Sequence, residues 1–133
     1  MASASLFVDW GWCSNPPWQG TTQIPINVGQ TTAYDLFFAS QVSPPLNVQS
    51  QGTAPSIYIT AINGVADNQN GNGYWWIYLI NNQEAQVGCD SYLVQDGDVI
   101  AWVYLHYNTG MAQPNHPQRF TRTAAAKNRP KPR

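Results

Sequence analysis

Three apolar segments between Tyr58 and Tyr104 constrain the fold of this chain more than any other part of it. Turns rich in Asn, Gly and Asp join them, and the stretch holds eight Tyr or Trp residues but no Lys, Arg or His. Short apolar segments separated by turn residues of this kind predict β-strands, here over residues 56–62, 73–80 and 98–106. A stretch so rich in aromatic residues and so poor in basic residues favours a binding function. We expect that this chain is not an enzyme.

The first part of the chain predicts two more strands and one helix. Alternating apolar residues predict strands over residues 5–12 and 21–28, and Pro25 indicates that the second is an edge strand or contains a bulge. Residues 31–42 change to a helical rhythm. Thr32 and Asp35 resemble a capping box, and Tyr34, Phe38 and Val42 recur at four-residue spacing. We expect one short helix whose apolar stripe, made of these last three residues, packs against a sheet.

This order of elements, β-β-α-β-β-β, predicts the fold class. A hairpin, a crossing helix and a return to the sheet predict an α+β protein of the β-grasp (ubiquitin-like) type, with about five strands. A β-sandwich is the alternative, which the helix disfavours. At 133 residues the chain forms one domain, expected over residues 1–112, followed by a basic Pro-containing tail at 113–133.

The small net charge of −1 hides a strong segregation along the chain. All seven acidic residues precede residue 99, and all six basic residues lie in the tail: Arg119, Arg122, Lys127, Arg129, Lys131 and Arg133. Such a split indicates an interaction segment whose partner is an acidic surface. A sister subunit is favoured over nucleic acid, because the acidic body would repel a polyanion. A solvated terminus without a partner is the plain alternative.

The strand pattern also predicts where a binding surface lies. Alternation places aliphatic residues of the last strand, such as Val103 and Leu105, on the face that packs against the helix. The opposite face would then present rings to a ligand or partner. We expect these binding residues to be Tyr74, Trp76, Tyr78, Trp102 and Tyr104, extended by Trp10 and Trp12. Packing of the same rings in the core or under loops is one alternative. A register shift of one residue, which would exchange the two faces, is another.

Other candidate sites are weaker. Cys13 and Cys89 are the only cysteines, and a disulfide between them and two free thiols are equally consistent with the sequence. Asp90, Asp96 and Asp98 do not have the spacing of an EF-hand loop, so we expect no metal. The longest apolar run has seven residues against about 20 for a membrane span, and no secretory signal is visible.

Four segments in order carry a resemblance to a known family. They are Ile62–Asp67, Gly73–Tyr78, Ala85–Gly88 and Gln95–Val99. In these segments the chain resembles the transcobalamin-like C-terminal domain family, which includes the small β-domain of the cobalamin carriers and modules of bacterial surface proteins. The resemblance implies a β-grasp-like domain, usually extracellular and not enzymatic. A cobalamin-like ligand is also implied, but we expect no cofactor, because the chain has no helices for the second half of a corrin site.

Two functions follow from these observations as expectations. The first is a non-enzymatic binding module that presents its aromatic sheet face to a ligand or partner at a cell surface. The second is a structural subunit of a filament, virion or other assembly, in which the basic tail docks on acidic neighbours.

Overall fold

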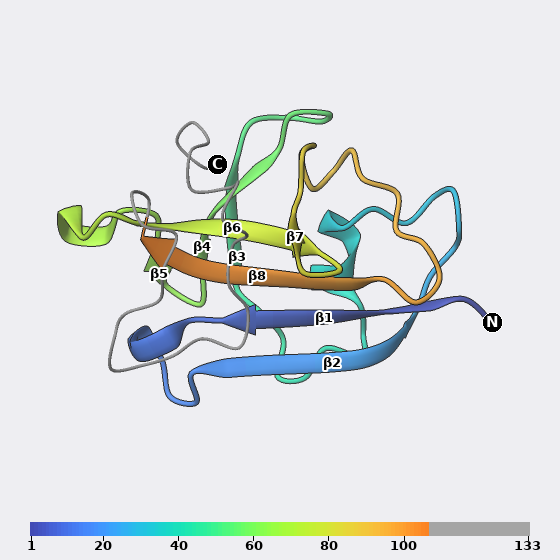
Figure 1. Ribbon diagram of the computed structural model, residues 1–133, viewed down its shortest axis with the longest axis horizontal. Coiled ribbons are helices and arrows are strands. Elements are labelled where there is room, and N and C mark those ends of the chain that lie inside the picture. The colour runs from blue at the N-terminus through green and yellow to red at the C-terminus, as the bar shows by residue number, and fades with distance from the viewer. Residues whose placement is uncertain (107–133) are drawn as a thin grey trace.

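Two β-sheets make up most of the part of the chain that the computed structural model describes, residues 1–106. The larger sheet has the order β2–β1–β8–β6–β7, and the smaller has the order β3–β4–β5 (Figure 1). The strands are β1 (Ser3–Asp9), β2 (Trp18–Pro25), β3 (Val48–Gln51), β4 (Tyr58–Ile62), β5 (Val65–Ala66), β6 (Tyr74–Ile80), β7 (Gln83–Glu84) and β8 (Val99–His106). Three 3₁₀ helices complete the list: η1 (Gly11–Cys13), η2 (Tyr34–Phe38) and η3 (Gln69–Gly71).

The first and last strands lie side by side at the centre of the larger sheet. β1 and β8 are parallel, with Leu6 opposite Ile100 and Val8 opposite Trp102. Antiparallel partners flank both of them, β2 beside β1 and β6 beside β8. Because the centre of the sheet joins the two ends of the described chain, it cannot form until both ends are present.

The described residues therefore form a small, mostly-β domain. All five predicted strands exist, although β1 and β2 begin about two to three residues earlier than predicted. A bulge between Ala4 and Leu6 disturbs the β1–β2 pairing, and β2 lies at the edge of the sheet, as Pro25 indicated. Strands β3, β5 and β7 were not predicted, because they are short, and β3 and β7 are polar.

The predicted helix and its apolar stripe were wrong in detail. The Thr32–Asp35 capping box is present, with reciprocal hydrogen bonds of 2.9 and 3.2 Å, but only the five-residue 3₁₀ helix η2 follows. Three residues per turn break the four-residue spacing, so Phe38 is 59% exposed while Leu36 and Phe37 are buried. The amides of Ala33 and Tyr34, which have no acceptor within the helix, donate to the carbonyls of Tyr92 and Cys89, and this ties η2 to a distant loop.

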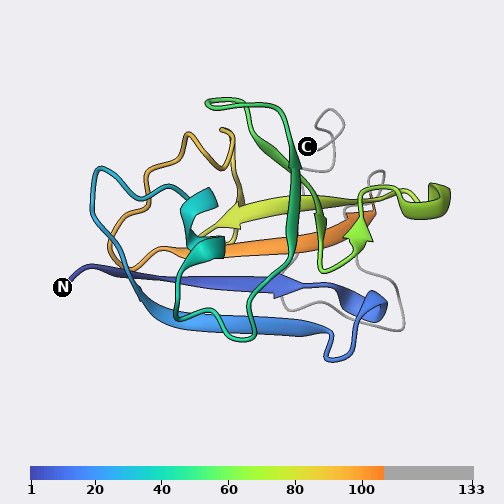
Figure 2. The same cartoon turned by 180° about the vertical axis from the view of Figure 1, so that it is seen from behind.

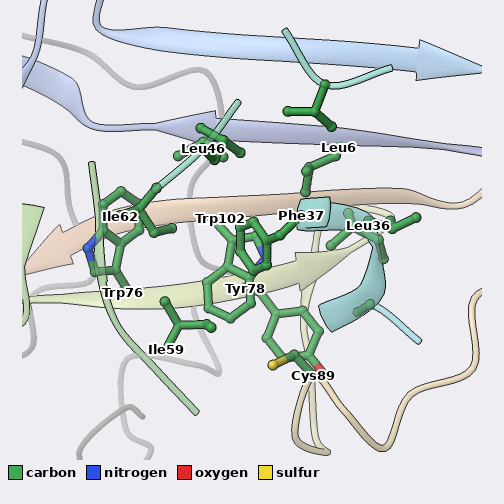
Figure 3. Close-up of a cluster of buried hydrophobic side chains, with 14 of the residues drawn as sticks. Leu6, Leu36, Phe37, Leu46, Ile59, Ile62, Trp76, Tyr78, Cys89 and Trp102 are labelled. Atoms are coloured by element: carbon green, nitrogen blue, oxygen red, sulfur yellow. The ribbon is translucent and has the colours of Figure 1, made fainter. Parts of the chain in front are cut away.

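The smaller sheet and η2 lie on one face of the larger sheet, which we call the inner face (Figure 2). The main core fills the space between these layers. Figure 3 shows its centre, where Phe37 of η2 meets Trp102 of β8 and Tyr78 of β6. Ile59 and Ile62 of the smaller sheet close the core from the opposite side. The opposite face of the larger sheet, the outer face, carries a second apolar cluster from β6 and β8.

The boundary expected at residue 112 and the whole basic tail lie outside the described residues. Within residues 1–106, no helix is both long and apolar enough to cross a membrane.

Candidate ligand- or partner-binding site

The structure buries most of the aromatic surface that was expected to be exposed. Trp76, Tyr78, Trp102 and Tyr104 are between 0 and 7% exposed, and Trp10 is 2% exposed. They belong to the main core together with η2 and the smaller sheet. The predicted exposure of these five side chains was therefore wrong, and the alternative of core packing was right. The strand register was correct, so the error lies in which face receives the second layer.

Hydrogen bonds to one short backbone segment explain how these rings can be buried. Trp10 Nε1 donates to the carbonyl of Ile62 at 3.0 Å, and Trp76 Nε1 donates to that of Val65 at 2.8 Å. The Tyr104 hydroxyl donates to the carbonyl of Ala66 at 2.6 Å. A buried Trp or Tyr needs a partner for its polar group, and the β4–β5 hairpin supplies all three. The rings thus fix the smaller sheet to the larger one.

Two of the predicted binding residues remain partly exposed, and they lie together. The rings of Trp12 and Tyr74 are half-buried, with centroids 4.6 Å apart and planes at 72°. Tyr74 also stacks on the buried Tyr104 at 5.6 Å, and His106 meets its edge at 5.2 Å. We call Trp12, Tyr74 and His106 the aromatic end site, because they gather where β6 begins and β8 ends.

The turn before β6 holds this site in place. Asn72 accepts a hydrogen bond from the Tyr74 amide at 2.8 Å, and its amide nitrogen donates to the Tyr104 hydroxyl at 3.0 Å. Gly73 has a φ of +77°, and a Cβ there would lie 3.0 Å from Nε2 of His106. Glycine is needed both for that backbone angle and for that contact. Asn72 was not predicted as a site residue, since the Asn/Gly-rich stretch indicates only a turn.

The tyrosine hydroxyls and the thiol around the site stay protonated near neutral pH. Burial raises the pKa of the Tyr74 hydroxyl, with a smaller contribution from Cys13, and burial also raises the pKa of the Cys13 thiol. The pKa of Tyr104 is raised mainly by burial as well. The site can therefore offer ring faces and neutral donors, but not a thiolate or phenolate.

A second concave feature lies beside the edge strand β7. It is an open groove of about 500 Å³ whose walls are mostly amide and small apolar side chains. The lining residues are Ile80, Asn81, Gln83, Glu84, Ala85, Gln86, Val87 and Tyr92. Tyr92 is fixed, because its hydroxyl donates to Asp98 at 2.5 Å, and burial together with this bond raises its pKa to about 12. Sequence reasoning did not single out this groove.

The structure also shows where the candidate cysteines and aspartates lie. Cys13 and Cys89 are both free thiols, Cys13 half-buried in η1 and Cys89 buried in the core. Asp98 accepts hydrogen bonds from Tyr92, Asn81 and the Gln95 amide, so its carboxylate stabilises the chain just before β8. Among residues 1–106, no three His, Cys, Asp or Glu side chains come together to hold a metal ion. The six tail residues predicted to act electrostatically lie outside the described part.

Comparison with known families adds one result. Residues 39–106 match the family described as Domain of unknown function (DUF4430), which is 68 of the 133 residues. The chain belongs to this family. The DUF4430 match begins after η2 and ends with β8, so it includes the smaller sheet, the turn that holds Asn72, and His106 of the aromatic end site. Comparison with curated proteins gives no match.

Proposed function

We propose that this chain is a non-enzymatic binding module that recognises a ligand or partner through the aromatic end site. The observation that carries the proposal is the half-exposed Trp12–Tyr74 pair, whose rings lie 4.6 Å apart. Aromatic side chains contribute large contact areas at low cost in conformational entropy, which is why they dominate recognition sites. The proposed ligand is therefore one with a flat, uncharged face, such as a sugar ring or a corrin.

Preorganisation supports this role. Tyr74 rests on the buried ring of Tyr104, and Asn72 bonds to both residues. A site whose rings are already held in place loses little conformational entropy on binding, so more of the contact energy appears as affinity.

The sheet topology supports a β-grasp assignment and hence the resemblance to the transcobalamin-like family. A β-grasp sheet has its first and last strands parallel at the centre, each flanked by an antiparallel strand. The order β2–β1–β8–β6–β7, with β1 parallel to β8, has this arrangement. Membership in DUF4430 is compatible with such a module. From the resemblance to the transcobalamin-like family we propose a location outside the cell or at its surface.

The test is a titration followed by the indole N–H resonances of the six tryptophans. Cyanocobalamin and cellohexaose serve as probes for corrin and sugar faces. We expect the Trp12 resonance to shift with one of them, while the resonance of the buried Trp102 stays in place. Tyr74→Ala should abolish the shift, whereas Tyr58→Ala, at another half-buried tyrosine, should not. Unchanged Trp12 resonances with both probes at millimolar concentration would contradict the proposal.

A structural subunit of an assembly is the second candidate, favoured by the separation of charge. All seven acidic residues precede residue 99, and the six basic residues follow residue 118. Contacts between the tail of one copy and the body of another would weaken as salt screens them, over a Debye length of about 10 Å at 0.1 M. In that case size-exclusion chromatography at low salt shows large species that dissociate at high salt, whereas a binding module elutes as a monomer in both.

A further inference from the structure

Two exposed amide side chains in the turn before β6 are held by their oxygen atoms. The backbone amide of Gly73 donates to Oδ1 of Asn68 at 2.8 Å. The backbone amide of Ala66 donates to Oε1 of Gln69 at 3.0 Å. Only the oxygen of a side-chain amide can accept from a backbone N–H, so these bonds fix which end of each side chain is the NH2 group. Among residues 1–106, neither NH2 group has an acceptor, and both are donors held in place.

The turn that carries these donors is joined directly to the aromatic end site. The backbone amide of Asn68 donates to the carbonyl of Tyr74 at 2.6 Å. η3, which begins at Gln69, lies at the same end of the larger sheet as η1, which carries Trp12 (Figures 1 and 2). Aromatic rings and amide donors are therefore gathered at one end of the sheet.

The angle between the two half-exposed rings restricts the shape of a ligand. The planes of Trp12 and Tyr74 are inclined at 72°. A flat macrocycle such as a corrin can lie against the face of only one ring in such a pair. A pyranose is small enough to contact both rings, and its slightly positive C–H groups are attracted to the electron-rich face of an aromatic ring. The crossed rings therefore favour a sugar over a corrin.

We propose that the aromatic end site binds a neutral pyranose unit of an oligosaccharide, whose hydroxyl oxygens accept hydrogen bonds from Asn68 and Gln69. This inference rests on the proposed function and narrows its ligand to one chemical class. Donors that are already held in place lose little conformational entropy on binding, so more of their interaction energy appears as affinity. A neutral sugar is favoured over an acidic one, because residues 1–106 carry seven Asp or Glu residues and no Lys or Arg.

NMR titrations with three probes test the inference. Cellohexaose and mannohexaose supply neutral pyranose units, and cyanocobalamin supplies a corrin. We expect the indole N–H resonance of Trp12 to shift with at least one of the two oligosaccharides and not with cyanocobalamin. The side-chain NH2 resonances of Asn68 and Gln69 should shift in the same titration.

A double variant tests the two donors. Asn68→Asp/Gln69→Glu keeps the oxygens that accept from the backbone and removes both NH2 groups. It should weaken binding of the oligosaccharide at least about fivefold, because each lost hydrogen bond costs about two- to tenfold. Asn63→Asp/Asn70→Asp is the matched control, since it adds two negative charges at exposed asparagines and leaves both donors in place. The control should change the affinity less than about twofold, and circular dichroism establishes that both variants are folded.

Three results would overturn the inference, and only the third also overturns the proposed function. The first is a Trp12 shift with cyanocobalamin alone, which keeps a binding role for the aromatic end site but assigns it a corrin. The second is an oligosaccharide that binds Asn68→Asp/Gln69→Glu as tightly as the unaltered protein, without a shift of the two NH2 resonances. The third is a Trp12 resonance that stays in place with all three probes.

Discussion

The indole nitrogen of Trp76 donates a hydrogen bond to the carbonyl oxygen of Val65 at 2.8 Å, across the interface between the two sheets. Trp102, on the neighbouring strand, is equally buried, but its indole nitrogen has no hydrogen-bond partner among residues 1–106. The two residues thus differ in one interaction while sharing the same core. We therefore expect the polar groups of the buried rings, and not ring area alone, to hold the smaller sheet in place.

The first prediction uses this pair. Trp76→Phe should lower the free energy of unfolding by about 1–3 kcal/mol more than Trp102→Phe does, because only the former leaves a buried carbonyl without its donor. Both changes remove the same volume, so the cavity term is similar. Urea unfolding followed by circular dichroism measures the difference. Equal losses in the two variants would show that the Trp76–Val65 bond does not stabilise the fold.

The second prediction concerns Gly20, which lies under the ring of Phe7. A Cβ at Gly20 would approach Cε2 of Phe7 to 2.5 Å, far inside van der Waals contact. Gly20→Ala should therefore destabilise the protein by about 1–3 kcal/mol through overpacking. In a Phe7→Leu background the same change should cost clearly less. A double-mutant cycle with thermal unfolding measures this coupling, and additive losses would contradict it.

The third prediction concerns the carboxylate of Asp98, which accepts three hydrogen bonds just before β8, from Asn81, Tyr92 and the Gln95 amide. Asp98→Asn should lower stability by about 1–3 kcal/mol, because one carboxylate oxygen becomes a donor that faces other donors. Asp96→Asn is the matched control: the exposed Asp96 accepts one bond, from the Ser3 amide at 3.0 Å, and an amide oxygen can replace that acceptor. Denaturant midpoints should separate the two variants, and identical midpoints would count against the Asp98 network.

The fourth prediction is a loss of stability at alkaline pH. Burial is the main cause that raises the pKa of Cys89 to about 12 from an ordinary value of 9.0, and Asp90 adds to it. The unfolded state then loses its proton near pH 9 while the folded state keeps it, so the stability from this group is complete below pH 9 and falls as pH rises towards 12. The slope is about 1.4 kcal/mol per pH unit for one group.

Cys89→Ala should remove that contribution and make the decline between pH 9 and 12 shallower. Urea unfolding at pH 8, 9.5 and 10.5 checks the slope, and Cys13→Ala serves as the comparison because Cys13 is only half-buried. An unchanged slope in Cys89→Ala would mean that Cys89 does not titrate differently in the folded and unfolded states.

Local patterns in the sequence were sufficient for most of the strands. Alternation identified β1 and β2, and apolar segments between turn residues identified β4, β6 and β8. Pro25 correctly indicated an edge strand or a bulge. The Thr32–Asp35 capping box also formed as predicted. Each of these features depends on residues within a few positions of one another. Strand β3, with the polar sequence VQSQ, has no such pattern, and its pairing with β4 depends on backbone hydrogen bonds that composition does not encode.

The length of the helix at residues 31–42 and the identity of its buried residues could not be predicted from the local sequence. Its first amides find acceptors at Cys89 and Tyr92, more than fifty residues away. Those bonds anchor the start of the segment, while the amides of Asp35 and Leu36 donate to carbonyls three residues back. The result is a five-residue 3₁₀ turn that buries Leu36 and Phe37 instead of Phe38.

The sequence by itself determined that β6 and β8 have an aromatic face and an aliphatic face, because side chains alternate along any strand. Only the tertiary structure decided which face lies against the smaller sheet, since both are apolar and either could be buried. The decision follows from three carbonyl oxygens of the β4–β5 hairpin, which accept hydrogen bonds from Trp10, Trp76 and Tyr104. Aliphatic side chains have no group to offer those acceptors, so the rings face inward.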